Sequence, residues 1–254
     1  MVIFEQPLNE QIRACLRLAH LFQEFEQYRL LPEGVASQTA LLALLRMIEV
    51  MDRPDLKAKL SQLLNQQTVG LAALSHVPQV DRSKLTKLLA ELEVIANDFT
   101  ALPTKLGETL RNHPFLKPLR MHLNNPGGLC PLGNPSYALW LQQGEKERMG
   151  WLAAWAEEIH PIQKVIDVIL KLIRETGPMQ SVVAEEGVYQ QTLEPTIPYQ
   201  LIRVGLPLRL NVYPDISVGR HRVYVRFRVL EAGRFKTPSE VPADISFKLA
   251  CCKL

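Results

Sequence analysis

Residues 203–213 read Arg-Val-Gly-Leu-Pro-Leu-Arg-Leu-Asn-Val-Tyr, and residues 220–229 read Arg-His-Arg-Val-Tyr-Val-Arg-Phe-Arg-Val. Both stretches alternate with a period of two, which predicts β-strands whose side chains point to opposite faces of a sheet. The positions expected to pack on a core are apolar: Val204, Leu206, Leu208, Leu210, Val212, Val223, Val225, Phe227 and Val229. The positions expected on the other face are mostly arginine and tyrosine: Arg203, Arg209, Asn211, Tyr213, Arg222, Tyr224, Arg226 and Arg228. The two stretches therefore predict a hairpin with one buried face and one basic face.

Positive charge is concentrated in this part of the chain. Residues 199–228 contain six Arg and one Asp, a net charge of +5, whereas the whole chain carries only +3 and the rest therefore sums to −2. Such a basic element predicts a partner that bears carboxylates or other acidic groups. Arginine binds carboxylates with a bidentate fork, and Arg and Tyr are enriched at protein interfaces. The alternative explanation is a solvated strand face whose arginines prevent edge-to-edge aggregation.

The segment before residue 178 has the periodicity of helices. Its apolar residues recur at spacings of three and four, and typical helix start and stop residues delimit the runs. Asn9 and Asp81 are expected to cap two of the helices. The predicted helices cover 9–30, 38–51, a stretch beginning at Pro54, a stretch capped by Asp81, 103–112, 115–123, 135–143, 145–159, and a last stretch that opens at Pro161 and stops at Gly177-Pro178.

After Gly177-Pro178 the period changes from 3.6 to two, which indicates strands. Strands are expected at 187–193, 200–213, 220–230 and 245–252, with turns at 213–215 and 231–233. Helices first and strands last predict an α+β protein. The predicted domains are an N-terminal all-helical domain over residues 1–178 and a small antiparallel β domain with the basic face over residues 179–254. Residues 2–4 are a candidate for an added edge strand.

The sequence contains no motif of a known catalytic or cofactor site. Walker A, G-x-G-x-x-G, H-E-x-x-H and G-x-S-x-G patterns are absent, and the six histidines lack metal-ligand spacing. Cys15, Cys130, Cys251 and Cys252 fit neither a disulfide framework nor a zinc site, which indicates a reduced, cytosolic protein. No apolar run approaches the ~20 residues of a transmembrane helix, and the N-terminus does not resemble a signal peptide. We predict a protein that is not an enzyme, holds no metal or cofactor and does not bind membranes directly.

Three further clusters allow both a chemical and a structural interpretation. Glu157-Glu158-Ile159-His160 could be an acid–base group, but its place at a helix junction favours an ordinary cap. Cys251-Cys252 could be a redox pair, but a core-facing cysteine at the end of a strand is the commoner case. The three tryptophans are expected to pack helices rather than to form a ligand cage; they are Trp140, Trp151 and Trp155.

Five stretches form a pattern through their order and spacing. They are Phe4-Glu5-x-Pro7-Leu8-Asn9-Glu10 with Arg13, Leu16 and Arg17 after it, Pro126-Gly127-Gly128 followed by Cys130, Tyr213-Pro214-x-Ile216-Ser217, Arg222 with Arg226-Phe227, and Leu249-Ala250-Cys251-Cys252. None of them is a catalytic fingerprint alone. Together they resemble the ZapD family of cell division proteins from Gram-negative bacteria, over about residues 2–252.

The resemblance implies a helical part followed by a β part, a homodimer, and binding to the flexible C-terminal tail of the tubulin-like division GTPase FtsZ. It also implies crosslinking of FtsZ filaments in the cytokinetic ring, and therefore a cytoplasmic location at midcell. In relatives, the basic positions of the partner-binding surface match Arg17, Arg53, Arg222 and Arg226. The strand pattern adds Arg203 and Tyr224 to this candidate surface. The chain departs from the family at Pro114, where relatives can carry a basic residue, and at Ala138, where they can carry a histidine.

A basic sheet could instead bind nucleic acid, which is the main alternative. The face is small, the chain's net charge is only +3, and no aromatic RNP-like signature is present, so we expect no nucleic-acid partner. An acidic tail fits the pattern better. Arg222 and Arg226 would stand ~13 Å apart along a strand, with Tyr224 between them as an apolar platform.

Overall fold

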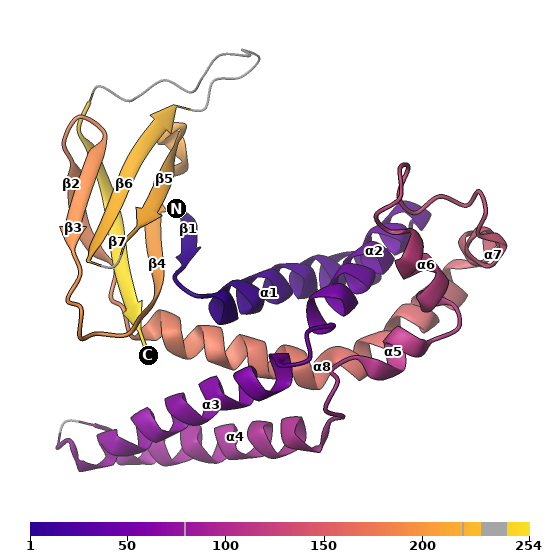
Figure 1. The fold of residues 1–254 in the computed structure, drawn as a ribbon, viewed down its shortest axis with the longest axis horizontal. Coiled ribbons are helices and arrows are strands. Elements are labelled where there is room, and N and C mark those ends of the chain that lie inside the picture. The colour runs from indigo at the N-terminus through magenta and orange to yellow at the C-terminus, as the bar shows by residue number, and fades with distance from the viewer. Residues whose placement is uncertain (79, 220, 230–242) are drawn as a thin grey trace. The chain divides into compact units, whose positions relative to one another are not determined.

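The computed structural model describes residues 1–78, 80–219, 221–229 and 243–254, and the predicted turn at 231–233 lies outside these ranges. The prediction of an α+β protein is confirmed: helices fill the N-terminal part and antiparallel sheets follow (Figure 1). The chain divides into two compact units. We call Ala14–Leu170 the helical unit, and Met1–Arg13 together with Lys171–Leu254 the β unit.

Eight α-helices occur in the described residues, and a short 3₁₀ turn, η1, precedes α4. Their bounds are α1 Glu10–Arg29, α2 Gly34–Met51, α3 Leu56–Ala73, η1 Leu74–His76, α4 Arg82–Ala101, α5 Glu108–Asn112, α6 Leu116–His122, α7 Pro135–Gln142 and α8 Glu145–Glu175. Both predicted caps are confirmed, because Asn9 Oδ1 accepts from the Ile12 amide at 2.9 Å and Asp81 Oδ1 accepts from the Lys84 amide at 3.1 Å. These caps fix where α1 and α4 begin.

Helix α2 is long and apolar enough to cross a membrane if length and composition alone are considered. More than half of it is buried among the other helices, including Leu41, Leu44 and Met47, which are fully inaccessible. A helix at the centre of a helical bundle reaches the same composition, because most of its surface packs against neighbouring helices. Its apolar sequence is therefore explained by its place in the core of the helical unit.

The prediction of two helices separated at Pro161 is wrong. Helix α8 runs without a break from Glu145 to Glu175 and contains Pro161. An internal proline costs about 3 kcal/mol because one backbone hydrogen bond is lost. The apolar stripe continues on both sides of it, and its members are all almost completely buried: Leu152, Trp155, Ile159, Ile162, Val165, Ile166 and Ile169. Burial of this stripe offsets the cost, at roughly 1.5–3 kcal/mol for each large side chain.

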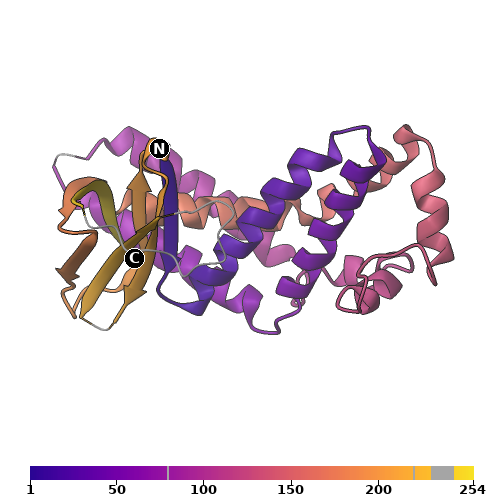
Figure 2. The ribbon, with the colours of Figure 1, turned by 90° about the horizontal axis from the view of Figure 1, so that it is seen from above.

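The β unit contains two antiparallel sheets. The first sheet has the strand order β1-β4-β7-β2, with β1 Val2–Pro7, β4 Tyr199–Leu206, β7 Ile245–Lys253 and β2 Gln180–Ala184. The second sheet has the order β3-β6-β5, with β3 Val188–Thr192, β6 Arg222–Val229 and β5 Val212–Val218. Figure 2 shows β1 alongside β4 at the edge of the first sheet. Ile3 of β1 pairs with Gly205 of β4, although about 200 residues of chain lie between them.

Apolar side chains of both sheets form one core. Its members include Ile202, Val204, Leu206, Val223, Val225, Phe227, Ile245, Phe247 and Leu249. The rings of Phe227 and Phe247 meet edge to face, with centroids 5.0 Å apart across the two sheets. The unit is therefore a small β-sandwich, and the faces turned away from this core are the ones available to partners.

The predicted single strand over 200–213 is wrong, and so is the predicted turn at 213–215. Strand β4 ends at Leu206, a 3₁₀ turn (η2, Leu208–Leu210) follows, and β5 begins at Val212 in the other sheet. Pro207 lacks the amide that a continuing strand needs, and Asn211 takes a left-handed conformation with φ of 49°. The hairpin therefore joins β5 to β6, and Leu208 is 78% exposed instead of buried. Strand β2 was not predicted, because five residues show too little alternation.

Candidate partner-binding surface

The outer face of the second sheet carries the basic side chains of β6. Arg222, Tyr224, Arg226 and Arg228 alternate with the buried residues of the same strand. Their cross-strand neighbours on this face are Val188, Gln190 and Thr192 of β3 and Tyr213, Asp215 and Ser217 of β5. We call these ten residues the arginine face. With three arginines and one aspartate, its net charge is +2.

The core-facing side of β6 fixes which way the arginines point. Val223, Val225 and Phe227 have no accessible surface, as the alternating pattern predicted. A one-residue slip in register would bury the arginines and expose these three side chains. The apolar core of the sandwich therefore holds the arginine face in a single orientation.

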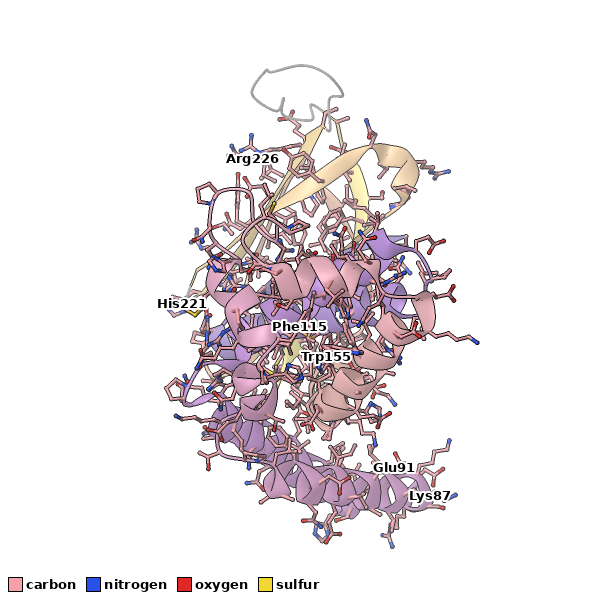
Figure 3. All side chains as sticks on the ribbon, turned by 90° about the vertical axis from the view of Figure 1, so that its right-hand side faces the viewer. Lys87, Glu91, Phe115, Trp155, His221 and Arg226 are labelled. Carbon is pink, nitrogen blue, oxygen red and sulfur yellow. The ribbon has the colours of Figure 1, made fainter. Side chains whose placement is uncertain are left out.

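Two contacts order the centre of the arginine face. The Arg226 guanidinium lies over the ring of Tyr224, 5.6 Å from its centroid, and its Nη2 donates to Tyr224 Oη at 3.1 Å. Arg228 Nη2 lies 3.3 Å from Asp215 Oδ2. Arg222 is exposed at the start of β6; Figure 3 labels His221, which precedes it in the chain, and Arg226, which lies further along the strand. A positioned guanidinium loses less rotamer entropy when a carboxylate binds it, because its side chain is already partly fixed.

Arg203 does not belong to the arginine face, although the strand pattern predicted that it would. It lies on β4 in the first sheet, opposite Glu5 of β1, and its Nε lies 3.0 Å from Glu5 Oε1. Arg174, near the end of α8, also contacts Glu5 with two hydrogen bonds of 2.8 and 2.7 Å. One carboxylate thus holds two guanidinium groups and ties β1, β4 and α8 together within the β unit.

We expect Glu5→Gln to destabilise the β unit by about 2 kcal/mol, below the 3–5 kcal/mol of a fully buried pair because Arg174 keeps partial contact with water. Two half-buried arginines would lose their shared negative charge, while the amide preserves the shape. Urea unfolding followed by amide exchange of β1 and β4 measures the change. Glu10→Gln is the control, since its ion pair with Arg13 is exposed and contributes little. Equal effects of the two substitutions would contradict the assignment.

The two remaining predicted site residues lie in the helical unit. Arg17 is exposed on α1, and Arg53 is half-buried between α2 and α3. The structure therefore brings together Arg222, Tyr224 and Arg226 of the predicted set, and assigns Arg17 and Arg53 to the other unit. The neighbours on β3 and β5 were missed. The alternation of residues 187–193 could have indicated Gln190 and Thr192. Asp215 was missed because residues 213–215 were predicted to form a turn.

Other groups that can carry chemistry are packed as structural elements. Burial raises the pKa of Cys251 to about 11 and also raises the pKa of Cys252, so both are neutral thiols at pH 7. In the helical unit Phe115 stacks on Trp155 with centroids 5.9 Å apart (Figure 3), and Trp140 and Trp151 join this cluster. The tryptophans thus pack helices, as expected. Within the described ranges, no group of three or more His, Cys, Asp or Glu side chains is arranged to hold a metal ion.

A groove of about 710 Å³ lies between α3 and α4 in the helical unit. Leucine, alanine and threonine side chains line most of it, including Leu64, Ala90 and Thr100. Lys87 and Glu91 stand together on α4 at helical spacing (Figure 3), outside the lining of the groove. None of the lining residues described is arginine or lysine, so the arginine face is the stronger candidate for recognition of an acidic partner.

Comparison with known proteins gives consistent matches along the chain. A family model described as "ZapD: Cell division protein" matches residues 16–226. The "Cell division protein ZapD" of Coxiella burnetii (strain RSA 493 / Nine Mile phase I) is 44% identical over 253 residues, which are 100% of this chain and 98% of the relative. The protein of the same name from Ralstonia nicotianae (strain ATCC BAA-1114 / GMI1000) is 33% identical over 253 residues, 99% of both chains.

Proposed function

The chain belongs to the ZapD family of cell division proteins, and on this premise we propose that its arginine face binds the C-terminal tail of FtsZ. We further propose that the protein is a homodimer that crosslinks FtsZ filaments in the cytoplasm at the division site. The observation that carries the proposal is the arginine face itself: three arginines and two tyrosines on one face of a sheet, with a net charge of +2. In this role the protein acts by binding and not by catalysis.

Tail binding would combine charge with apolar contact. Arg222 and Arg226 lie four residues apart on β6, so they can hold two carboxylates of one extended chain ~13 Å apart. Tyr224 offers a flat apolar surface between them, already in contact with Arg226. A flexible tail loses conformational entropy when it binds, so the affinity of a single tail is modest.

Filament crosslinking would follow from several tails acting together. One tail site per chain can decorate a filament but cannot join two filaments. A dimer presents two sites, a filament presents many tails, and the second binding event then occurs at high effective concentration. Bundling can therefore be strong even though each contact is weak.

The proposal is tested with purified protein and FtsZ filaments, with and without the FtsZ tail. We expect bundling, measured by light scattering and sedimentation, only when the tail is present, and a dimer in analytical ultracentrifugation at micromolar concentration. Bundling of tailless FtsZ would refute the tail site. A monomer that still bundles filaments would refute the role of the dimer. Binding of duplex DNA with comparable affinity would favour a nucleic-acid function instead.

The dependence of tail binding on salt gives a second test of the proposed Arg–carboxylate contacts. The Debye length falls from ~10 Å at 0.1 M to ~3 Å at 1 M ionic strength. We expect the affinity for a tail peptide to fall at least about tenfold across this range, because exposed Arg–carboxylate contacts are screened. The apolar core should keep the circular dichroism spectrum unchanged. An affinity that does not depend on salt would mean that charge does not hold the tail.

A further inference from the structure

Strand β3 forms one edge of the second sheet, and its free side carries backbone groups without a strand partner among the described residues. The Phe227 amide donates to Gly187 O at 2.8 Å, and the Leu193 amide donates to His221 O at 2.8 Å. Alternate residues of a strand direct their backbone groups to opposite sides. Gly187 and Leu193 bond on the side of β6, so the even-numbered residues of β3 direct their backbone groups away from β6. Gln190 and Thr192 therefore each present an N–H and a C=O at the free edge.

This edge lacks the features with which proteins usually protect exposed strands. Its sequence, Val188-Tyr189-Gln190-Gln191-Thr192, contains no charge, proline or glycine. The opposite edge strand, β5, contains Pro214 and Asp215. Prolines, charges and bulges normally prevent edges from pairing with another chain. Val188 is already paired, since its amide donates to Glu185 O at 2.8 Å, so the open part of the edge is Tyr189–Thr192. This part is suited to pairing with a short extended peptide.

The chemistry on the two sides of this edge differs. On the outer side, Val188 and Thr192 are the cross-strand neighbours of Arg226 and Arg222. These side chains are uncharged and short, so the arginines can reach across β3. On the inner side, a groove of about 180 Å³ opens between β2 and β3, lined by Val182, Gln191, Ile197, Tyr199, Leu249 and Cys251 among others. The lining of this groove is mixed, since it also includes Thr176, Gln180 and Lys253. A strand added at this edge would direct alternate side chains toward the arginines and toward this groove.

We propose that the acidic tail binds as a fourth strand on the free edge of β3, with carboxylates toward Arg222 and Arg226 and the intervening side chains toward the groove between β2 and β3. This inference rests on the proposed function and specifies how the tail is held. Backbone pairing supplies affinity, and alternate side chains supply specificity. Glu185, Glu186 and Glu194 flank the two ends of β3 and would repel carboxylates placed beyond the arginines, which restricts the register of the tail.

The test is a proline at the outward position of the edge. Gln190→Pro removes the amide that points away from β6, and the bonds from β6 to Tyr189 and Gln191 remain, so the sheet should still form. We expect this variant to bind the FtsZ tail peptide about tenfold more weakly, because the lost pairing removes one or two hydrogen bonds. Gln190→Ala is the matched reference, because it truncates the same side chain and keeps the amide; the tenfold loss is expected of the proline variant relative to this alanine variant. Amide exchange of β6 verifies that the sheet is intact.

A second measurement uses two modified tail peptides and the unmodified protein. Each peptide is N-methylated at every second residue within the bound segment, one set offset from the other. Only the peptide whose methyl groups face β3 should lose binding, since alternate amides of an added strand point toward the sheet. The inference is overturned if both peptides bind equally well, or if Gln190→Pro binds the tail as tightly as Gln190→Ala does. If Arg226→Glu alone weakens binding, the tail lies across the arginine face and the proposed function survives. If the unmodified protein does not bind the tail, both proposals are wrong.

Discussion

Arg226→Glu is expected to abolish binding of the FtsZ tail and bundling of filaments in a protein that remains folded. The substitution changes the net charge of the arginine face from +2 to 0 and places a glutamate directly opposite Asp215. It also removes the guanidinium from the ring of Tyr224. Loss of one partner of a charge pair at an interface costs about 2–5 kcal/mol, so we expect the affinity to fall about 100-fold. Fluorescence anisotropy of a labelled tail peptide measures it.

Lys248→Glu is the matched control for this substitution. Lys248 is exposed on β7 of the first sheet, between the buried residues Phe247 and Leu249. The change in charge is the same, and the position is also in the middle of a strand, but the side chain lies outside the arginine face. We expect its tail affinity to stay within about twofold, since a distant exposed charge is screened by salt. If Arg226→Glu folds correctly and bundles FtsZ like the unmodified protein, the arginine face is only a solvated surface.

The strand β6 could be predicted residue by residue from the sequence because its information is local. Val223, Val225 and Phe227 alternate strictly with polar residues, and β-branched or aromatic side chains favour strands. The period of two then determines which side chains share a face. The predicted grouping of Arg222, Tyr224 and Arg226 was correct for the same reason.

The break between β4 and β5 could not be predicted from alternation, because alternation continues through it. Leu208 and Leu210 hold positions that would be buried in a strand, yet both are exposed on η2. The deciding features are Pro207 and the left-handed Asn211, which transfer the chain from one sheet to the other. A pattern read along one strand does not reveal that the chain changes sheets.

The role of Arg203 was hidden for a different reason. Its partner, Glu5, lies 198 positions earlier in the chain and meets it only because β1 pairs with β4. Long-range strand pairing leaves no local signal, so an arginine neutralised across two strands has the same sequence signature as an exposed one. The continuity of α8 through Pro161 is a related case, because burial on both sides of the proline outweighs its local preference.

Val225→Asp is expected to destabilise the β unit by more than about 4 kcal/mol, because an unpaired carboxylate would be buried. Val225 has no accessible surface and lies between Tyr189 and Ile216 of the flanking strands. Val225→Ala, which removes only volume, should cost about 2 kcal/mol. Arg222→Asp introduces the same carboxylate on the exposed side of β6 and should cost about 0.5 kcal/mol. Urea unfolding monitored by amide exchange of the β-strands gives all three values.

The location of the tryptophans makes this experiment selective. Trp140, Trp151 and Trp155 all lie in the helical unit, so their fluorescence follows that unit alone, whereas amide exchange of β6 follows the sandwich. Val225→Asp should therefore lose protection in β6 at urea concentrations where Arg226→Glu retains it. The two substitutions, one residue apart, should fail differently: one abolishes binding in a folded protein, and the other removes the sheet that carries the binding face. A Val225→Asp protein as stable as Arg222→Asp would mean that this side of β6 does not face the core.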